Sequence, residues 1–380
     1  MYLNCGAFVA FTRPPLHRQP TQNSDMTRWK SNSLAIVLIS ALTFALGPFT
    51  PLAASAQSNE GKKATPANKK AVPANNARAA KPKQSNPARG VADFTRDGMP
   101  NLLSHAAMVF DPATGRALYS KNADAPVPIA SITKLMTAMV VLEAKQNMDE
   151  PITIDAADID TLKNTRSRLP VGTAFRREDL MRLALMASDN RAAHALGRTY
   201  PGGLEAALEA MNTKAKLLGL QATRFVDPTG LAPGNVASPQ DLAILVTEAS
   251  RYPEIREFST APELFVTLPN ARHPMGFNNT NALVKSGNWN IGLSKTGFIN
   301  EAGKCLVMHA FINNSPVVIV LMDSWGRLTR IGDANRIKRW IESGKVALGV
   351  AADARPLFKS GAAAGALSTP SVDARTSGPG

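Results

Sequence analysis

Residues 128–144 read PIASITKLMTAMVVLEA, an apolar run that contains a serine and a lysine three positions apart. The part from Ile132 to Leu142 is apolar on nearly every side, which predicts a core helix with Ser131 in its first turn. Residues three apart are neighbours on a helix, so the amine of Lys134 can reach the hydroxyl of Ser131. An apolar setting lowers the pKa of a lysine, and the neutral amine can then take a proton from serine. The pair therefore indicates a serine nucleophile with a lysine base.

Taken alone, the pair also fits a serine that caps a helix and a lysine that snorkels, because S-x-x-K arises by chance about once in a chain of this size. Two later segments favour a catalytic role for the pair. MASDNRAA contains Ser188-Asp189-Asn190 between two helical stretches, and NIGLSKTGFINEAGK contains Lys295-Thr296-Gly297 ahead of a late hairpin. Each alone fits a turn or a strand end. Together they supply the second hydroxyl, the second cation and the amide that acyl transfer by a Ser-Lys pair needs around it.

The ordered set S-x-x-K, S-x-N and K-T-G is that of β-lactamases and penicillin-binding proteins, and the resemblance extends over residues 106–345. AMVFDPATGRALYSKNADAPVPIASITKLMTAMVVLEA and ATRFVDPTGL are similar to serine D-alanyl-D-alanine peptidases, the low-molecular-weight penicillin-binding proteins. SRLPVG, NRAAHALG and MNTKAKLLGL resemble the endopeptidase type of this family, penicillin-binding protein 7. The resemblance implies an α/β (α+β) fold of the β-lactamase/transpeptidase type, an antiparallel sheet flanked by helices with a helical subdomain.

The resemblance also implies catalytic roles for three side chains. Ser131 is expected to be the nucleophile and Lys134 its base, while Ser188 relays a proton to the leaving amine. The backbone N–H groups of Ser131 and Phe298 are expected to form the oxyanion hole.

Four further residues are implied in substrate binding. Asn190 would hydrogen-bond the substrate amide and steady Lys134. Lys295 and Thr296 would hold a carboxylate, and Gly297 would let the substrate lie close against a strand.

Members of this family cut the D-Ala-D-residue bond in peptidoglycan stem peptides, and β-lactams are their covalent inhibitors. The resemblance therefore implies a D,D-endopeptidase that cleaves D-Ala-diaminopimelate cross-links. A D-alanyl-D-alanine carboxypeptidase fits the motifs equally, because both scissile amines stand next to a carboxylate and the choice depends on cleft width. A serine β-lactamase fits less well, since residues 221–234 contain no glutamate for deacylation. A catalytically silent wall-binding protein is disfavoured by the intact motifs.

Four segments follow one another along the chain: a leader over 1–56, a basic Lys/Ala/Pro-rich linker over 57–93, a peptidase domain over 94–348 and a tail over 349–380. The leader contains a secretory signal that starts at Met26, with a small-residue cleavage site at 54–56. Its apolar stretch is shorter than the roughly 20 residues that span a bilayer. We expect export, to the periplasm of a Gram-negative cell, as a soluble or loosely wall- or membrane-associated protein without an integral membrane anchor. Linker and tail are expected to be disordered, having little to bury.

The linker over 57–90 carries eight Lys or Arg and one Glu, which is half of the formal net charge of +14. It fits either a solvated tether or a contact with an anionic polymer such as the cell wall. No aromatic side chain is interleaved to stack on bases, and export argues against nucleic acid.

Histidines and cysteines suggest no further chemistry. Four histidines after the leader show no metal-ligand spacing, and Cys305 is the only cysteine there, so no metal site is expected. The sequence has no phosphate-binding glycine loop, and no cofactor is implied.

Hydrophobic periodicity predicts the elements of the domain. Residues 106–122 indicate a hairpin that turns at 112–115, and residues 306–322 indicate another that turns at 313–315. Helices are predicted over 177–199 with a break at 188–190, over 238–252 with Ser238 as N-cap, and over 328–345 with Leu328, Ile331, Ala334, Ile337 and Ile341 on one stripe. Strands at both ends of a helical middle imply a sheet assembled from the two ends of the domain.

Overall fold

The computed structural model describes residues 92–267, 272–346 and 348. The predicted leader and tail, and the linker up to residue 91, lie outside the described residues. Within the described part, no helix combines the length and the apolar character that crossing a membrane requires.

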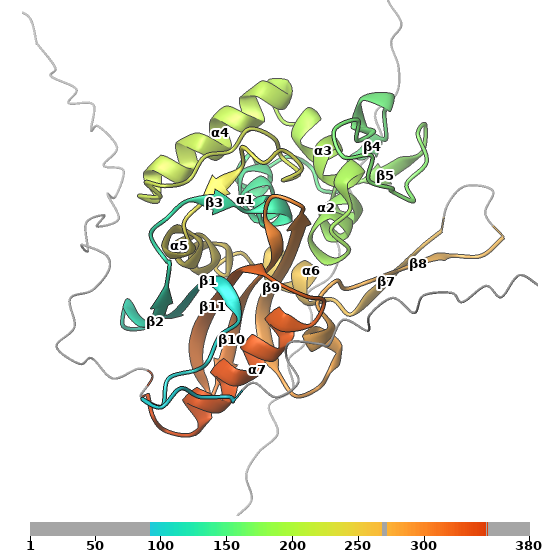
Figure 1. Cartoon of the computed structure of the whole chain (residues 1–380). Coiled ribbons are helices and arrows are strands. Elements are labelled where there is room, and N and C mark those ends of the chain that lie inside the picture. Colours follow the sequence, from blue (N-terminus) through green and yellow to red (C-terminus); the bar gives the residue numbers. More distant parts are fainter. Residues whose placement is uncertain (1–91, 268–271, 347, 349–380) are drawn as a thin grey trace, which may run out of the picture. The chain divides into compact units, whose positions relative to one another are not determined.

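One antiparallel sheet of five strands forms the centre of the domain, in the order β2-β1-β11-β10-β9 (Figure 1). The first two strands come from the start of the domain and the other three from its end, which confirms the predicted assembly from both ends. The strands are β1 (Ser104–Asp111), β2 (Arg116–Lys121), β9 (Asn290–Ile299), β10 (Gly303–Ile312) and β11 (Ser315–Ser324).

The late hairpin turns more tightly than the sequence predicts. Ser315 already belongs to β11, where it pairs with Ile312, so only Asn313 and Asn314 form the turn. Both asparagines have positive φ, 50° and 60°, as a two-residue hairpin turn requires. Asparagine tolerates this conformation better than most residues, which explains why two asparagines occupy the turn.

Hydrophobic cores cover both faces of the sheet, because side chains of a strand alternate between its faces. On β1, Ala107 and Val109 face α7 (Thr329–Glu342), whereas Met108 and Phe110 face the other helices. The predicted last helix is therefore present but shorter. Leu328, expected on its buried stripe, precedes the helix and is 55% exposed.

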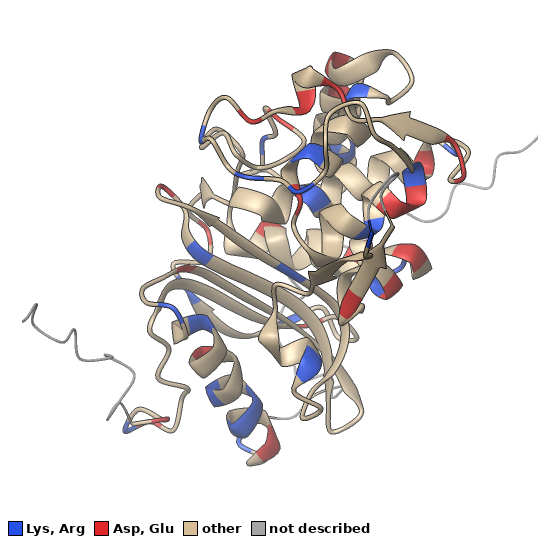
Figure 2. Cartoon of the chain, turned by 90° about the vertical axis from the view of Figure 1, so that its right-hand side faces the viewer, with Lys and Arg blue, Asp and Glu red and all other residues tan. Residues whose placement is uncertain are grey.

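The second face of the sheet carries the helical part of the domain, with the buried helix α1 (Lys134–Glu143) at its centre. Charged side chains lie mainly on helices and loops, and the central strands carry few of them (Figure 2). The other helices are α2 (Arg177–Met186), α3 (Asn190–Arg198), α4 (Gly203–Leu217), α5 (Pro239–Ala249) and α6 (Pro253–Thr260). The predicted N-cap of α5 is confirmed, since the Ser238 hydroxyl accepts a hydrogen bond from the Asp241 N–H.

Short two-stranded ladders and 3₁₀ turns connect these elements. The ladders join β3 (Val127–Pro128) to β6 (Val236–Ala237), β4 (Pro151–Thr153) to β5 (Ala174–Arg176), and β7 (Glu263–Val266) to β8 (Met275–Asn278). The 3₁₀ turns are η1 (Ala130–Thr133), η2 (Ala156–Asp158) and η3 (Ala282–Lys285).

Candidate active site

Ser131 lies in η1, and the α-helix begins only at Lys134, which corrects the expectation of Ser131 in the first α-helical turn. The physical reason is that the turn closes 3₁₀ hydrogen bonds, from the Ile132 N–H to the Ile129 carbonyl and from the Lys134 N–H to the Ser131 carbonyl. Ala130, just before Ser131, has a left-handed φ of 48°. The Thr133 hydroxyl donates to the Ala130 carbonyl and stabilises this tight turn. The nucleophile candidate is thus held on a turn that directly precedes a buried helix.

The Lys134 amine is the centre of the site. It donates hydrogen bonds to Ser131 Oγ at 2.8 Å, to Asn190 Oδ1 at 2.7 Å and to the Thr229 carbonyl at 2.6 Å. Its side chain is 1% exposed. Burial lowers the pKa of Lys134 from 10.5 to about 7, although the carboxylates of Asp227, Asp189 and Asp160 oppose the shift. Near neutral pH this lysine is therefore present in both protonation states.

The break between α2 and α3 places Ser188 and Asn190 against the two lysines. Ser188 has φ 60°, a strained conformation for a residue with a side chain, and such strain persists where the surroundings impose it. Asp189 caps α3 by accepting from the Ala192 N–H. The sequence predicted the break, but only the structure shows its left-handed backbone.

Lys295 and Thr296 lie on β9, an edge strand of the sheet. The Lys295 amine is 1% exposed and donates to Ser188 Oγ at 2.7 Å and to the Thr296 carbonyl at 3.0 Å. Burial first, and then the charges of Lys134 and Arg330, lower the pKa of Lys295 well below its ordinary value. The Thr296 hydroxyl donates to Thr280 Oγ1 at 2.7 Å.

Glycine permits two close approaches to the backbone around Ser131. A side chain at Gly297 would lie 3.0 Å from the Ile129 carbonyl and 3.2 Å from the Ser131 nitrogen. A side chain at Gly230, whose φ is 82°, would lie 1.9 Å from the Ala130 carbonyl oxygen. Beside Gly297, Phe298 is 55% exposed. Hydrogen bonds therefore join Ser131, Lys134 and Asn190, and a further one joins Ser188 to Lys295. Gly297 lies close to the Ser131 backbone, and Thr296 and Phe298 flank it on β9.

A loop over residues 160–165, here named the Asp160 loop, was not predicted from the sequence. Asp160 accepts four hydrogen bonds within the loop, from Leu162, Lys163 and Thr165. Burial acts to raise the pKa of Asp160, but these hydrogen bonds outweigh it and hold the pKa below its ordinary value. Asn190 Nδ2 donates to Thr165 Oγ1 at 2.8 Å, which ties the loop to the amine network of Lys134.

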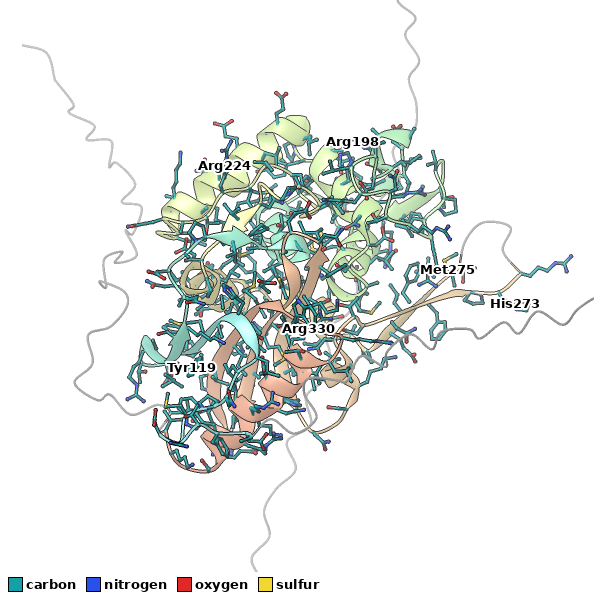
Figure 3. The ribbon with its side chains drawn as sticks, in the orientation of Figure 1. Tyr119, Arg198, Arg224, His273, Met275 and Arg330 are labelled. Atoms are coloured by element: carbon teal, nitrogen blue, oxygen red, sulfur yellow. The ribbon has the colours of Figure 1, made fainter. Side chains whose placement is uncertain are left out.

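Arg330 is a further residue near the site that was not predicted from the sequence. It stands in the first turn of α7, beside the sheet (Figure 3). Its Nε is buried and has no hydrogen-bond partner among the described residues. Burial lowers the pKa of Arg330, and its charge acts on Lys295. Nothing in GRLTRIGDANR distinguishes this arginine from its neighbours, so only its burial next to Lys295 identifies it.

Two pockets adjoin the site. One of about 190 Å³ is lined by Asn190, Thr229 and part of the Asp160 loop. The other, of about 370 Å³, is lined by Phe298, Asn300, Lys304 and Trp325 among others. The site residues thus border concave surface on two sides.

Known proteins resemble the chain over the region that contains this site. Residues 94–326 match the family described as D-alanyl-D-alanine carboxypeptidase. A curated D-alanyl-D-alanine endopeptidase of Pseudomonas aeruginosa is 48% identical over 245 residues, which cover 64% of this chain and 79% of that protein. A D-alanyl-D-alanine endopeptidase of Escherichia coli is 47% identical over 255 residues, covering 67% of this chain and 82% of that protein.

Solved structures agree with the fold. The crystal structure of the Streptomyces K15 DD-transpeptidase has a TM-score of 0.60 and 28% sequence identity, and the match covers 64% of this chain and 98% of that one. The similarity therefore extends to the tertiary arrangement as well as to the sequence.

Proposed function

The chain belongs to the D-alanyl-D-alanine carboxypeptidase family, and from this premise we propose that it is a serine D,D-endopeptidase that hydrolyses D-Ala-diaminopimelate cross-links in peptidoglycan through an acyl-enzyme on Ser131. The observation that carries the chemistry is the Lys134 amine, 2.8 Å from Ser131 Oγ with a pKa lowered to about 7. The two curated relatives that are nearly half identical are both named endopeptidases, which supports the specificity.

Acylation follows from the three hydrogen bonds of Lys134. A neutral amine has two N–H donors and one lone pair. Donation to Asn190 Oδ1 and to the Thr229 carbonyl leaves the lone pair facing the Ser131 hydroxyl. As Ser131 Oγ bonds to the carbonyl carbon of D-alanine, its proton passes to the amine. The oxyanion that forms would be stabilised by the N–H groups of Ser131 and Phe298.

Departure of the leaving group needs a proton on its nitrogen. Ser188 accepts a hydrogen bond from Lys295 at 2.7 Å, so its own proton is free to pass to the leaving amine while Lys295 replaces it. The C–N bond breaks and the amine departs, and proton exchange with solvent restores Lys134 and Lys295. Water then attacks the ester carbon, its proton passes to Lys134, and Lys134 returns that proton to Ser131 Oγ as the ester bond breaks. Lys295 therefore acts through Ser188.

The carboxylate next to the scissile nitrogen would be held by Thr296, with Lys295 and the charge of Arg330 behind it. Thr296 lies on β9 with its hydroxyl hydrogen-bonded to Thr280, and Arg330 is near enough for its charge to act on Lys295. Hydrogen bonds to a charged group contribute about 1.5–3 kcal/mol, so this group would anchor the leaving side. Because terminal D-alanine carries the same carboxylate, carboxypeptidase activity is the second candidate, and the family description favours it.

We also propose that the protein acts outside the cytoplasm, in the periplasm. The support is the secretory signal read over residues 26–56 and the location of peptidoglycan itself. β-Lactams are expected to acylate the same serine, because they present a strained amide and a carboxylate to the same groups.

The test compares cross-linked dimeric muropeptides with monomeric pentapeptides as substrates of the purified protein. We expect dimers to be converted to monomers, with slower or no release of free D-alanine, measured by chromatographic separation of the products. Ser131→Ala should abolish both the conversion and covalent labelling by fluorescent penicillin. Rapid D-alanine release with intact dimers would turn the assignment to a carboxypeptidase, and fast hydrolysis of penicillin to a β-lactamase.

A further inference from the structure

The proposed function fixes the direction in which the acyl part of the substrate, the residues before D-alanine, runs along β9. The leaving carboxylate is assigned to Thr296, and the oxyanion to the N–H of Phe298. A peptide that follows this order runs antiparallel to β9, so its residues before D-alanine extend past Phe298 toward the turn between β9 and β10. That turn contains Glu301.

An ion pair joins two segments that are distant in the sequence at this end. Lys163 Nζ, in the Asp160 loop, lies 2.5 Å from Glu301 Oε1, in the turn between β9 and β10. Lys163 is in the Asp160 loop, which contacts Asn190 through Thr165. Glu301 follows Phe298 by three residues, a distance of at most about 11 Å along the chain. The pair therefore lies where the acyl peptide leaves the nucleophile.

Both charged groups are accessible, and the backbone of Lys163 is held. The Lys163 and Glu301 side chains are 25% and 40% exposed. The hydrogen bonds within the Asp160 loop fix the main chain of Lys163, whose own N–H donates to Asp160. An exposed ion pair contributes only about 0–1 kcal/mol to stability, so exchange of partners costs little. Each group can therefore turn to a charge on the substrate.

The substrate offers one charge for each of them. In this class of peptidoglycan the stem residue before D-alanine is meso-diaminopimelate, and its side chain ends in a D-centre with a free ammonium and a free carboxylate. We propose that Lys163 and Glu301 bind these two groups, Lys163 the carboxylate and Glu301 the ammonium, and so select acyl stems that carry diaminopimelate. The inference rests on the proposed function and names the acyl-side specificity of that site. Exchange of partners leaves every charge paired, which avoids the cost of an unpaired charge.

The experiment uses two synthetic cross-linked dimers that differ only in the acyl stem, with meso-diaminopimelate or L-lysine before D-alanine. Variants Lys163→Gln and Glu301→Gln are assayed on both dimers, together with their rate of acylation by benzylpenicillin, which lacks the diamino acid. Arg251→Gln is the matched control, since Arg251 forms an exposed ion pair with Glu248 at 3.0 Å elsewhere.

We expect wild type to prefer the diaminopimelate dimer. Lys163→Gln should lose about tenfold in kcat/KM on that dimer with little change on the lysine dimer, which lacks the carboxylate. Glu301→Gln should lose on both dimers, because both stems carry the ammonium, and neither variant should change acylation by penicillin. The double variant Lys163→Glu, Glu301→Lys keeps an ion pair between the two positions. It places a negative charge near the substrate carboxylate and a positive charge near the ammonium, so it should remain impaired on the diaminopimelate dimer. Recovery in that double variant, or equal losses on both dimers and penicillin, would mean that the pair only ties the Asp160 loop to the β9–β10 turn.

Failure of this inference and failure of the proposed function give different results. A wild-type protein that opens both dimers at the same rate contradicts the diaminopimelate site and leaves the endopeptidase intact. A wild-type protein that is acylated by penicillin but opens neither dimer contradicts the proposed function itself.

Discussion

Lys134 is the residue whose environment decides whether the site can react. Its amine meets three acceptors, which would satisfy all three donors of an ammonium, yet burial favours loss of the charge. Three carboxylates nearby keep the pKa from falling further. The balance leaves the group close to neutrality at the pH at which a base is needed.

Acylation should therefore depend on pH through Lys134. In the proposed mechanism the neutral amine is the reactive form, so the second-order rate constant with fluorescent penicillin should fall as pH drops below about 7, by roughly tenfold per pH unit. Asp160→Asn removes one of the negative charges that raise this pKa, so the midpoint should move to lower pH. The measurement is a pH profile of the labelling rate between pH 5 and 9. A flat profile through neutrality would rule out Lys134 as the base.

At the scale of the element, the turn that carries Ser131 is packed directly against a loop. Asp227 accepts backbone hydrogen bonds from Thr229, Gly230 and Ala232, which shapes this loop. The loop presents the Thr229 carbonyl to Lys134, while Gly230 touches the Ala130 carbonyl. A side chain at Gly230 would therefore push on the nucleophile turn itself.

Gly230→Ala should slow acylation and lower the melting temperature. The substitution adds the cost of a left-handed backbone, about 1–2 kcal/mol, to a backbone clash at 1.9 Å. Gly219→Ala is the control, because Gly219 also has positive φ but an added side chain would meet nothing within 4 Å. The control should show the conformational cost alone and acylate normally, as measured by thermal melting and penicillin labelling. Equal behaviour of the two variants would show that the contact with Ala130 does not matter.

At the scale of the whole molecule, the charge is divided unevenly along the chain. The linker over 57–90 carries +7 of the formal +14, whereas residues 91–380 carry +4. A concentrated positive segment can bring an enzyme to an anionic polymer, and small soluble substrates would not feel this effect.

Replacing the eight Lys and Arg of the linker with Gln should slow the digestion of intact wall sacculi and leave the hydrolysis of soluble dimers unchanged. The difference should fade toward about 1 M salt, where charges are screened beyond about 3 Å. Release of soluble muropeptides over time, at two salt concentrations, provides the measurement. Equal loss on sacculi and on dimers would assign the linker a role in folding or activity instead of wall contact.

The amino-acid sequence by itself determined the features that depend on neighbours along the chain. The hairpins, the N-cap at Ser238, the break before Asn190 and the S-x-x-K spacing all follow from local periodicity, turn chemistry and capping. The motif set also contains the residues Ser131, Lys134, Ser188, Asn190 and Lys295, which the structure joins by hydrogen bonds. These patterns are readable because their energetics are settled within a few residues.

Tertiary structure alone decided which distant groups meet and in what charge state. Lys295 reaches Ser188 across 107 positions and Lys163 reaches Glu301 across 138, and no local pattern specifies either contact. The lowered pKa of Lys134 and the unpartnered Nε of Arg330 arise from burial, which only packing of the complete domain produces. The same holds for the left-handed backbone of Ala130 and Ser188, because its strain is compensated by surrounding contacts and not by the residue itself.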